Sequence, residues 1–332
     1  RYAAGARSAT DAEVVAVDAD GADLLVRSDG ADRAGRIERL AFPEPAADLA
    51  GVYAQVYAAV GRARATVGEA EPITSLEREL TVTRSLPTFV TEVESVREIA
   101  HDLREIVVAG GLDGFRSLGA DQFVFLMLPT DEAPIDEAYS MEVWRTTEPR
   151  PPGAYYTVRS FDPDAGRMVL WAVTHGHDGG VGGWAATCAP GDRIGLWGPR
   201  EGMGVPRDAR SLLMFADASG VAAVAVILDE LPATIPVRVL IEVGRADEVV
   251  ELPAHANSSV VWLFRGADEP GTGTRLFDAV RAEPIVADGL VVFGAGESKQ
   301  MTQIRKYLRH DVGLAASAVY VTGYWRRARR PA

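Results

Sequence analysis

The chain has 332 residues, a length that allows two or three domains of roughly 150 residues each. Its 34 basic and 47 acidic residues give a formal net charge of −13, which argues against general nucleic-acid binding because phosphate backbones are held by clustered Lys and Arg. The 47% hydrophobic and 24% charged content excludes a disordered chain.

The single cysteine and the lack of long apolar runs bear on the compartment. Cys188 alone cannot form an internal disulfide or a thiolate zinc site, which favours a reducing environment. No apolar run reaches the ~18 residues of a membrane span, and no hydrophobic signal segment opens the sequence. We therefore expect a soluble, cytoplasmic, multidomain protein with a small-molecule substrate and neither a membrane span nor a nucleic-acid partner.

Residues 1–68 are predicted to form a small α+β module. Two β-type runs, 13–18 and 22–27, flank a turn and predict a hairpin, and a third strand is expected over 36–42. Apolar residues at helical spacing then predict a helix that ends near Arg64. The module has little core of its own.

Residues 80–200 are predicted to form an antiparallel β-barrel or sandwich. Many short strands with Gly and Pro between them are typical of these folds. The strands are expected near residues 92–96, 104–109, 122–128, 140–144, 155–159, 168–173 and 192–197.

Residues 205–327 are predicted to form an α/β domain with a parallel sheet. Nearly continuous apolar strands alternate with helical stretches, which indicates a sheet that is covered on both faces. The helices are expected over 221–230, 275–282 and 299–308. A barrel followed by such a domain is a layout that can hold a flavin against a nicotinamide, although layout alone does not establish function.

A series of short motifs within residues 85–327 resembles a known family. In chain order they are Tyr156-Thr157-Val158-Arg159, Phe161-Asp162, His175-Gly176, Trp184-Ala185, Pro190-Gly191-Asp192, Gly198-Pro199-Arg200, Asp217, Gly296-Glu297, Arg305 and Gly323-Tyr324-Trp325-Arg326. The ordered set is similar to the siderophore-interacting protein family of ferric-siderophore reductases, within the ferredoxin-reductase-like superfamily. Residues 1–68 resemble, more weakly, a small haem-utilisation-like domain.

The resemblance implies a flavin enzyme with a Greek-key, flavin-binding barrel. FAD would lie between the barrel and the α/β domain, with NAD(P)H as the hydride donor and Fe(III) in a siderophore as the electron acceptor. Fe(II), once formed, is held poorly by hard oxygen ligands and can leave. The cofactor supplies this chemistry, and the protein supplies position and electrostatics.

Residues of the barrel suit a flavin. Tyr156 offers an aromatic face for an isoalloxazine ring, and Thr157 offers a hydroxyl for a flavin nitrogen or carbonyl. By strand alternation Arg159 points to the same face as Thr157 and could reach a phosphate. The alternatives are a core tyrosine and a surface arginine.

The glycine-rich loop that holds His175 and Gly176 and precedes Trp184 suits a diphosphate. Its successive amide groups could form an anion-binding nest, and a helix at Trp184 would add its positive dipole end. A flexible hairpin loop is the alternative. We expect no metal site, because the few ligand-type side chains stand in one loop without a second cluster.

Two strand-to-helix turns are candidates for the nicotinamide nucleotide. Asp217 and Ser219 open a helix after one strand, and Gly296-Glu297 follows another, where ligands of α/β sheets gather. Neither turn is a G-x-G-x-x-G fingerprint, so the assignment depends on the resemblance. A helix cap and a tight turn are the alternatives.

The C-terminal segment is the main basic patch of an acidic chain. Tyr324 and Trp325 could cover the flavin, while Arg326 and Arg327 could attract an anionic ferric chelate. A solvated tail is the alternative, and we favour it for Arg329 and Arg330. Cys188 is expected to be a small buried residue.

Three motifs depart from the family pattern. Ala154 replaces an arginine that neutralises the FAD diphosphate, 179–183 lacks the usual hydroxyl, and 217–223 departs from the family's nucleotide motif. Losing an arginine–phosphate contact costs on the order of 1.5–3 kcal/mol of binding free energy. A flavin-free relative that cyclises, isomerises or binds a small molecule therefore remains an alternative, as does recruitment of an iron-handling partner by residues 1–68.

Overall fold

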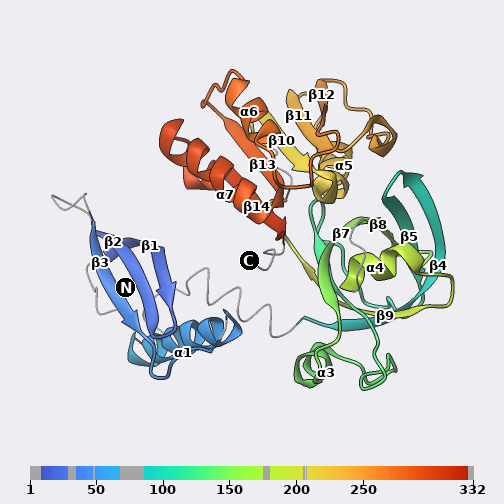
Figure 1. Cartoon of the computed structure of the whole chain (residues 1–332), viewed down its shortest axis with the longest axis horizontal. Coiled ribbons are helices and arrows are strands. Elements are labelled where there is room, and N and C mark those ends of the chain that lie inside the picture. The colour runs from blue at the N-terminus through green and yellow to red at the C-terminus, as the bar shows by residue number, and fades with distance from the viewer. Residues whose placement is uncertain are drawn as a thin grey trace. The chain divides into compact units, whose positions relative to one another are not determined.

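The computed structural model describes residues 9–28, 35–47, 49–67, 86–174, 180–204, 206 and 208–327 (Figure 1). The chain separates into two compact units, Arg1–Ser85 and Leu86–Ala332. His175 and Gly176 of the predicted diphosphate loop lie outside the described residues, as do Arg329 and Arg330. None of the helices in the described ranges combines the length and the apolar character that crossing a bilayer requires.

The first unit is a three-stranded antiparallel sheet with one helix beside it, so the predicted α+β module is confirmed (Figure 1). Its core is small, because only Ala22, Leu40, Phe42 and Ala59 form the main buried cluster. The elements are β1 (Ala9–Asp18), β2 (Gly21–Ser28), β3 (Arg36–Ala41) and α1 (Leu49–Val67).

The second unit begins with a closed six-stranded antiparallel barrel, as predicted, in the order β4-β5-β8-β7-β6-β9. The short helix α4 (Gly180–Thr187) buries Val181 and Ala185 in the apolar cluster that fills the barrel. The strands are β4 (Thr88–Ala100), β5 (Leu103–Ala109), β6 (Phe123–Met127), β7 (Gly153–Asp162), β8 (Arg167–Val173) and β9 (Arg193–Arg200).

The strand predicted over 140–144 is wrong, because this segment forms α3 (Met141–Thr146). The Ser140 hydroxyl accepts a hydrogen bond from the Val143 amide and caps the helix start. Met141 and Trp144, three positions apart, then reach the same apolar cluster outside the barrel. The helical spacing of these two residues outweighs the β propensity of the run.

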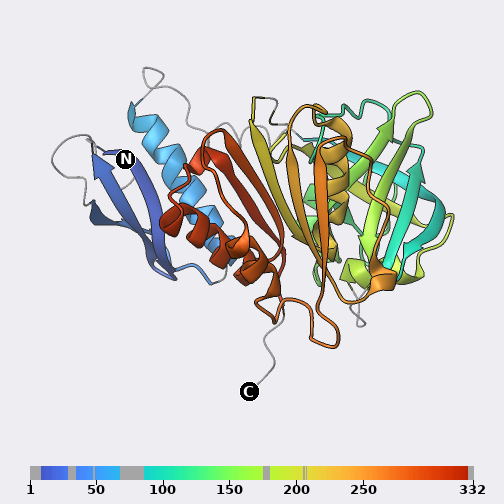
Figure 2. The same ribbon diagram turned by 90° about the horizontal axis from the view of Figure 1, so that it is seen from above.

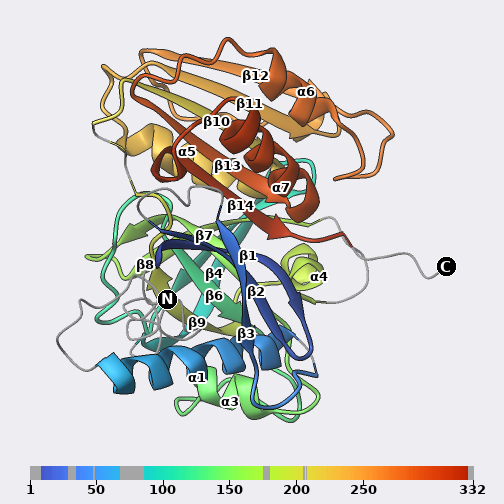
Figure 3. The same cartoon turned by 90° about the vertical axis from the view of Figure 1, so that its left-hand side faces the viewer.

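The second unit continues with a five-stranded parallel sheet in the order β12-β11-β10-β13-β14, as Figure 3 shows, and the predicted α/β domain is confirmed. Because β11 and β13 flank β10, the chain crosses from one side of β10 to the other, which leaves a crevice at the carboxyl ends of β10 and β13. The strands are β10 (Ser211–Asp217), β11 (Val237–Val243), β12 (Ser258–Phe264), β13 (Leu290–Glu297) and β14 (Val319–Trp325).

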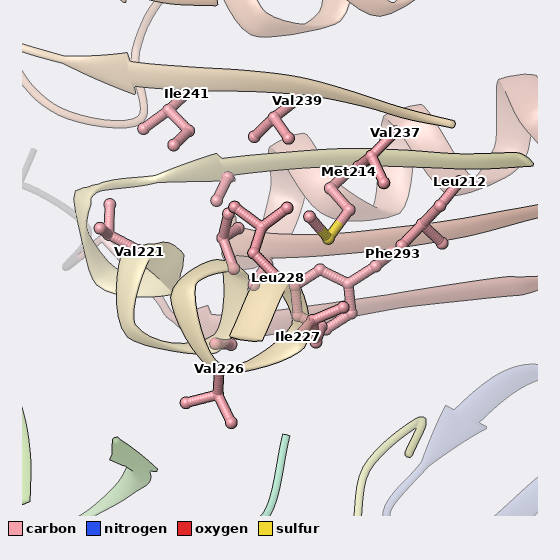
Figure 4. Packing of buried hydrophobic residues seen from close by; sticks show 14 of the residues in the cluster. Leu212, Met214, Val221, Val226, Ile227, Leu228, Val237, Val239, Ile241 and Phe293 are labelled. Carbon is pink, nitrogen blue, oxygen red and sulfur yellow. The ribbon is translucent and has the colours of Figure 1, made fainter. Parts of the chain in front are cut away.

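Helices cover both faces of this sheet (Figure 2). Helix α5 (Val221–Glu230) packs on one face, and α6 (Arg275–Ala282) and α7 (Ser298–Lys306) pack on the other. Residues 221–228 are all buried, because α5 contacts the sheet on one side and β7 of the barrel on the other. Figure 4 shows the side chains of α5 meeting Met214, Val239 and Phe293 of the sheet. Helix α5 therefore joins the barrel to the sheet.

Candidate functional site

The carboxyl end of β10 carries a buried aspartate that gathers four hydrogen-bond donors. Asp217 is 8% exposed, and its Oδ1 accepts from the Ser219 amide at 2.9 Å and from the Ser219 hydroxyl at 2.5 Å. Its Oδ2 accepts from the Glu297 amide at 3.0 Å and from Trp325 Nε1 at 2.7 Å. One carboxylate thus ties together β10, β13 and β14 at the crevice, and it unites four residues that the sequence singled out.

Glycine at position 296 permits this arrangement. A Cβ atom built on Gly296 would lie 2.8 Å from Asp217 Oδ2, which is closer than real Cβ contacts come. Any other residue at this position would therefore force the carboxylate away from the Glu297 amide.

Glu297 organises the start of α7. Its side chain is 1% exposed, and Oε2 accepts from the amides of Lys299 and Gln300 at 2.7 and 3.0 Å. The other oxygen, Oε1, accepts from the Arg327 amide at 3.4 Å. The carboxylate therefore caps the helix and also holds the chain that follows Trp325.

A second buried carboxylate lies on the barrel side of β14. The Thr157 hydroxyl of β7 donates to the Tyr324 oxygen, and the Tyr324 hydroxyl donates to Asp121 Oδ1 at 3.2 Å. Asp121 precedes β6, is 4% exposed and also accepts from the Met203 amide at 2.9 Å. This chain of hydrogen bonds links the barrel strand that carries Tyr156 to the last strand of the sheet.

Burial sets the protonation of these groups. It raises the pKa of Asp121 to about 6, against the opposing hydrogen bonds from Met203 and Tyr324. Burial, followed by the Asp121 charge, raises the pKa of Tyr324 well above its usual value, and burial raises the pKa of Tyr156 to about 12. Both phenols therefore remain neutral at physiological pH, whereas Asp121 titrates close to it.

Sequence analysis did not identify Asp121. Its backbone has a φ of 60°, a conformation that favours Asn, Asp and Gly, but this angle is known only from the structure. Its partner Tyr324 lies 203 residues further along the chain, so no local pattern could have paired them.

Tyr156 and Trp184 are half-buried and pack against the apolar cluster of the barrel. Cys188 is buried beside them, as expected, and its thiol donates to the Ala185 carbonyl at 3.7 Å. Ala154 contacts the same cluster, so an apolar contact stands where the family has its arginine.

The predicted anion-binding arginines have other partners or face solvent. Arg159 pairs with Asp229 of α5 at 2.7 Å and stacks over the Trp171 ring with its guanidinium carbon 5.0 Å from the centroid. Arg326 is exposed, and Arg327 Nη1 lies 3.9 Å from Glu269 Oε2. In this conformation Arg159 is therefore held in an ion pair with α5.

The residues around Tyr156 fit a flavin dinucleotide. A Cβ built on Gly180 or Gly183 would meet no atom within 4 Å, so the backbone at the start of α4 is open to a ligand. Helix α4 contacts β7, and Trp184 of α4 packs against the same barrel cluster as Tyr156. The donor set is thus an aromatic face, a hydroxyl and amides at a helix start, without the family's arginine.

Over the described residues, no group of three or more His, Cys, Asp or Glu side chains could hold a metal ion. The carboxylates of the site accept hydrogen bonds, and Asp121, with a pKa of about 6, can exchange a proton.

Comparison with known families finds two adjoining matches. The family described as "Siderophore-interacting FAD-binding domain" matches residues 92–203, which hold most of the barrel. The family described as "Siderophore-interacting protein" matches residues 209–328, which hold the parallel sheet and its helices.

Individual proteins agree with these matches. The NADPH-dependent ferric-chelate reductase of Escherichia coli is 32% identical over 238 residues, which cover 69% of this chain and 85% of that protein. A siderophore utilization protein from T. fusca has a TM-score of 0.64 at 29% identity, covering 74% of this chain and 95% of that one. A ferredoxin NADP+ reductase from Neisseria gonorrhoeae, with a TM-score of 0.52 at 16% identity over 72% of this chain and 99% of that one, shares the fold.

Proposed function

This chain belongs to the siderophore-interacting protein family, and we propose that it reduces ferric siderophores with electrons that pass from NAD(P)H through FAD. It is an oxidoreductase whose barrel is the FAD-binding domain of that family. The substrate of the proposed reaction is a small ferric chelate, and its product is Fe(II), which hard oxygen ligands hold weakly.

The proposal rests on β14, where a residue that contacts the barrel lies next to a residue that contacts the carboxyl end of β10. Tyr324 contacts Thr157 of the barrel, and its neighbour Trp325 donates to Asp217 at the carboxyl end of β10, where we expect the nucleotide. The two halves that the reaction needs therefore share one short segment. Ligands of α/β sheets bind at such a crevice, where the strand order reverses.

On the barrel side, the Tyr156 ring and the Thr157 hydroxyl would hold the isoalloxazine, and the open amides of α4 would hold the diphosphate. The bound FAD supplies the chemistry, since it accepts a hydride and releases single electrons.

On the sheet side, Asp217, Ser219 and Glu297 would position the nicotinamide nucleotide, and Gly296 keeps their backbone close. Trp325 would cover the flavin, while the exposed Arg326 and its neighbour Arg327 would attract an anionic chelate. A proton can be held or released at Asp121, because its pKa of about 6 lies near the working pH.

An absorption spectrum tests the proposal. Purified protein, as isolated or after addition of FAD, should show the visible bands of a bound flavin. Anaerobic addition of NADH or NADPH should bleach these bands. A ferric catecholate or hydroxamate should then restore them, while a colour-forming chelator traps the Fe(II).

Two variants of β7 make the test specific. Thr157→Val removes the hydroxyl predicted to contact the flavin, together with its hydrogen bond to Tyr324, and should weaken FAD affinity about tenfold, which corresponds to one lost hydrogen bond to the flavin. Ser160→Ala is the matched control, because Ser160 is exposed on the same strand. A colourless protein that FAD cannot reconstitute would overturn the proposal. It would favour the flavin-free alternative, for which Ala154 against the barrel cluster is the supporting observation.

A further inference from the structure

A pocket of about 430 Å³ lies at the carboxyl ends of β11 and β12, beside the Asp217 crevice. Gln300 of α7, whose backbone amide is bound by Glu297, donates from its side chain to the Gly273 carbonyl of the pocket wall at 3.2 Å. The volume suits one nucleoside-sized ligand group. The described lining residues are Glu242, Arg265, Asp268, Glu269, Gly273, Thr274, Arg275 and Asp278.

The pocket contains a buried carboxylate with an unused acceptor. Glu242 is 2% exposed, and its Oε2 has no hydrogen-bond partner among the described residues, although the carboxylate accepts from the Leu276 amide. Burial, and then the Asp217 charge, raises the pKa of Glu242. A buried acceptor without a donor is costly, and a hydroxyl group of a ligand would satisfy it.

The two arginines of the pocket already face carboxylates. Arg265 Nη2 lies 3.6 Å from Glu248 Oε2, and both side chains are mostly buried. Arg275 Nη2 lies 3.9 Å from Asp268 Oδ2. Of the described lining residues, four are carboxylates and two are arginines, so the wall is negative overall. A phosphate placed here would meet like charges, whereas a neutral diol would not.

We propose that this pocket takes the adenosine ribose of the reductant as a free 2′,3′-diol and thereby selects NADH over NADPH. The inference rests on the proposed function, because it names which nicotinamide nucleotide delivers the electrons. Glu242 accepts a ribose hydroxyl, and Asp278 and Glu269 repel a 2′-phosphate. A carboxylate at a strand end that binds this diol is a recurrent solution in dinucleotide-binding sheets.

Calorimetry with two probes tests the selection without flavin or iron chemistry. ADP-ribose and 2′-phospho-ADP-ribose are titrated into the full chain, and ADP-ribose should bind at least about tenfold more tightly. Equal affinities, or tighter binding of the phosphorylated probe, would overturn the inference. Flavin bleaching by both NADH and NADPH would still support the proposed function in that case, so the two failures are distinguishable.

Charge-neutral variants locate the selectivity. Asp278→Asn and Glu242→Gln should each shrink the preference about threefold or more, chiefly by tightening the 2′-phospho probe. The Asp278→Asn variant keeps the inference testable if the Glu242→Gln variant, at a buried position, fails to fold. Asp288→Asn is the control, because it removes one exposed carboxylate just before the amino end of β13, whereas the pocket lies at the carboxyl ends of β11 and β12. An unchanged ratio in both pocket variants, or an equal change in the control, would contradict the inference.

Discussion

The two buried carboxylates on either side of β14 differ in the hydrogen bonds that they accept. Tyr324 and Trp325 are neighbours, and each donates to one carboxylate: Tyr324 to Asp121 of the barrel and Trp325 to Asp217 of the sheet. Asp217 accepts hydrogen bonds from four donors. Asp121 accepts two, which lower its pKa by less than burial raises it, so that the pKa is about 6. Asp217 therefore holds three strands together through its four donors, whereas Asp121, with its raised pKa, can exchange a proton.

The comparison predicts the largest loss for Asp217→Ala. This change removes the acceptor that the buried Glu297 amide and Trp325 Nε1 share, and it uncaps the turn at Ser219. We expect the free energy of unfolding to fall by about 3–5 kcal/mol in denaturant titrations, because each buried orphan costs about 1–3 kcal/mol. Asp288→Ala, which removes a surface ion pair with Arg210, should cost less than about 1 kcal/mol. A loss for Asp217→Ala as small as the control's would refute the structural role.

Asp121→Asn should change how stability depends on pH. In the folded protein Asp121 keeps its proton up to about pH 6, whereas the unfolded chain releases it near 3.8. Raising the pH through this interval therefore destabilises the wild type, and the full effect, about 3 kcal/mol, is present above pH 6.

Because asparagine cannot ionise, the variant should be more stable than wild type at pH 7, and its advantage should vanish below about pH 4. Urea titrations of both proteins at pH 4, 5, 6 and 7 measure this difference directly. The same difference in unfolding free energy at pH 4 and pH 7 would show that Asp121 is not the group responsible.

The smallest effect is expected at the ion pair between Arg159 of the barrel and Asp229 of α5. Asp229→Asn removes the charge that pairs with Arg159 at 2.7 Å, but Asp229 is largely exposed. Exposed pairs contribute about 0–1 kcal/mol, so thermal unfolding should shift only slightly. If FAD affinity rises in this variant, the freed Arg159 reaches a phosphate as the sequence suggested; if affinity is unchanged, Arg159 serves α5 alone.

Local patterns predicted most of the fold because they depend on neighbouring residues. Apolar runs with intervening turns predicted the barrel strands, and the strand–helix alternation predicted the parallel sheet. The prediction failed at 140–144, where the Ser140 cap and the spacing of Met141 and Trp144 outweigh β propensity. Caps and contacts with a distant cluster are weak signals in a single sequence.

The candidate site, like the fold, was predicted only in part. Residues at strand ends were predictable, because the carboxyl ends of parallel strands converge, and the structure does bring Asp217, Ser219, Glu297 and Trp325 together. Asp121 and Glu242 were missed because their importance comes from burial and from partners far along the chain.

The sequence by itself determined the order of the elements, the family motifs and the strand-end positions of the acidic residues, since these follow from periodicity and turn chemistry along the chain. Only the tertiary structure decided that Trp325 meets Asp217 across 108 residues, that Arg159 meets Asp229, and that Glu242 has an unpaired oxygen. The physical reason is that hydrogen-bond partners and the loss of solvation are properties of the packed chain, which no local pattern carries.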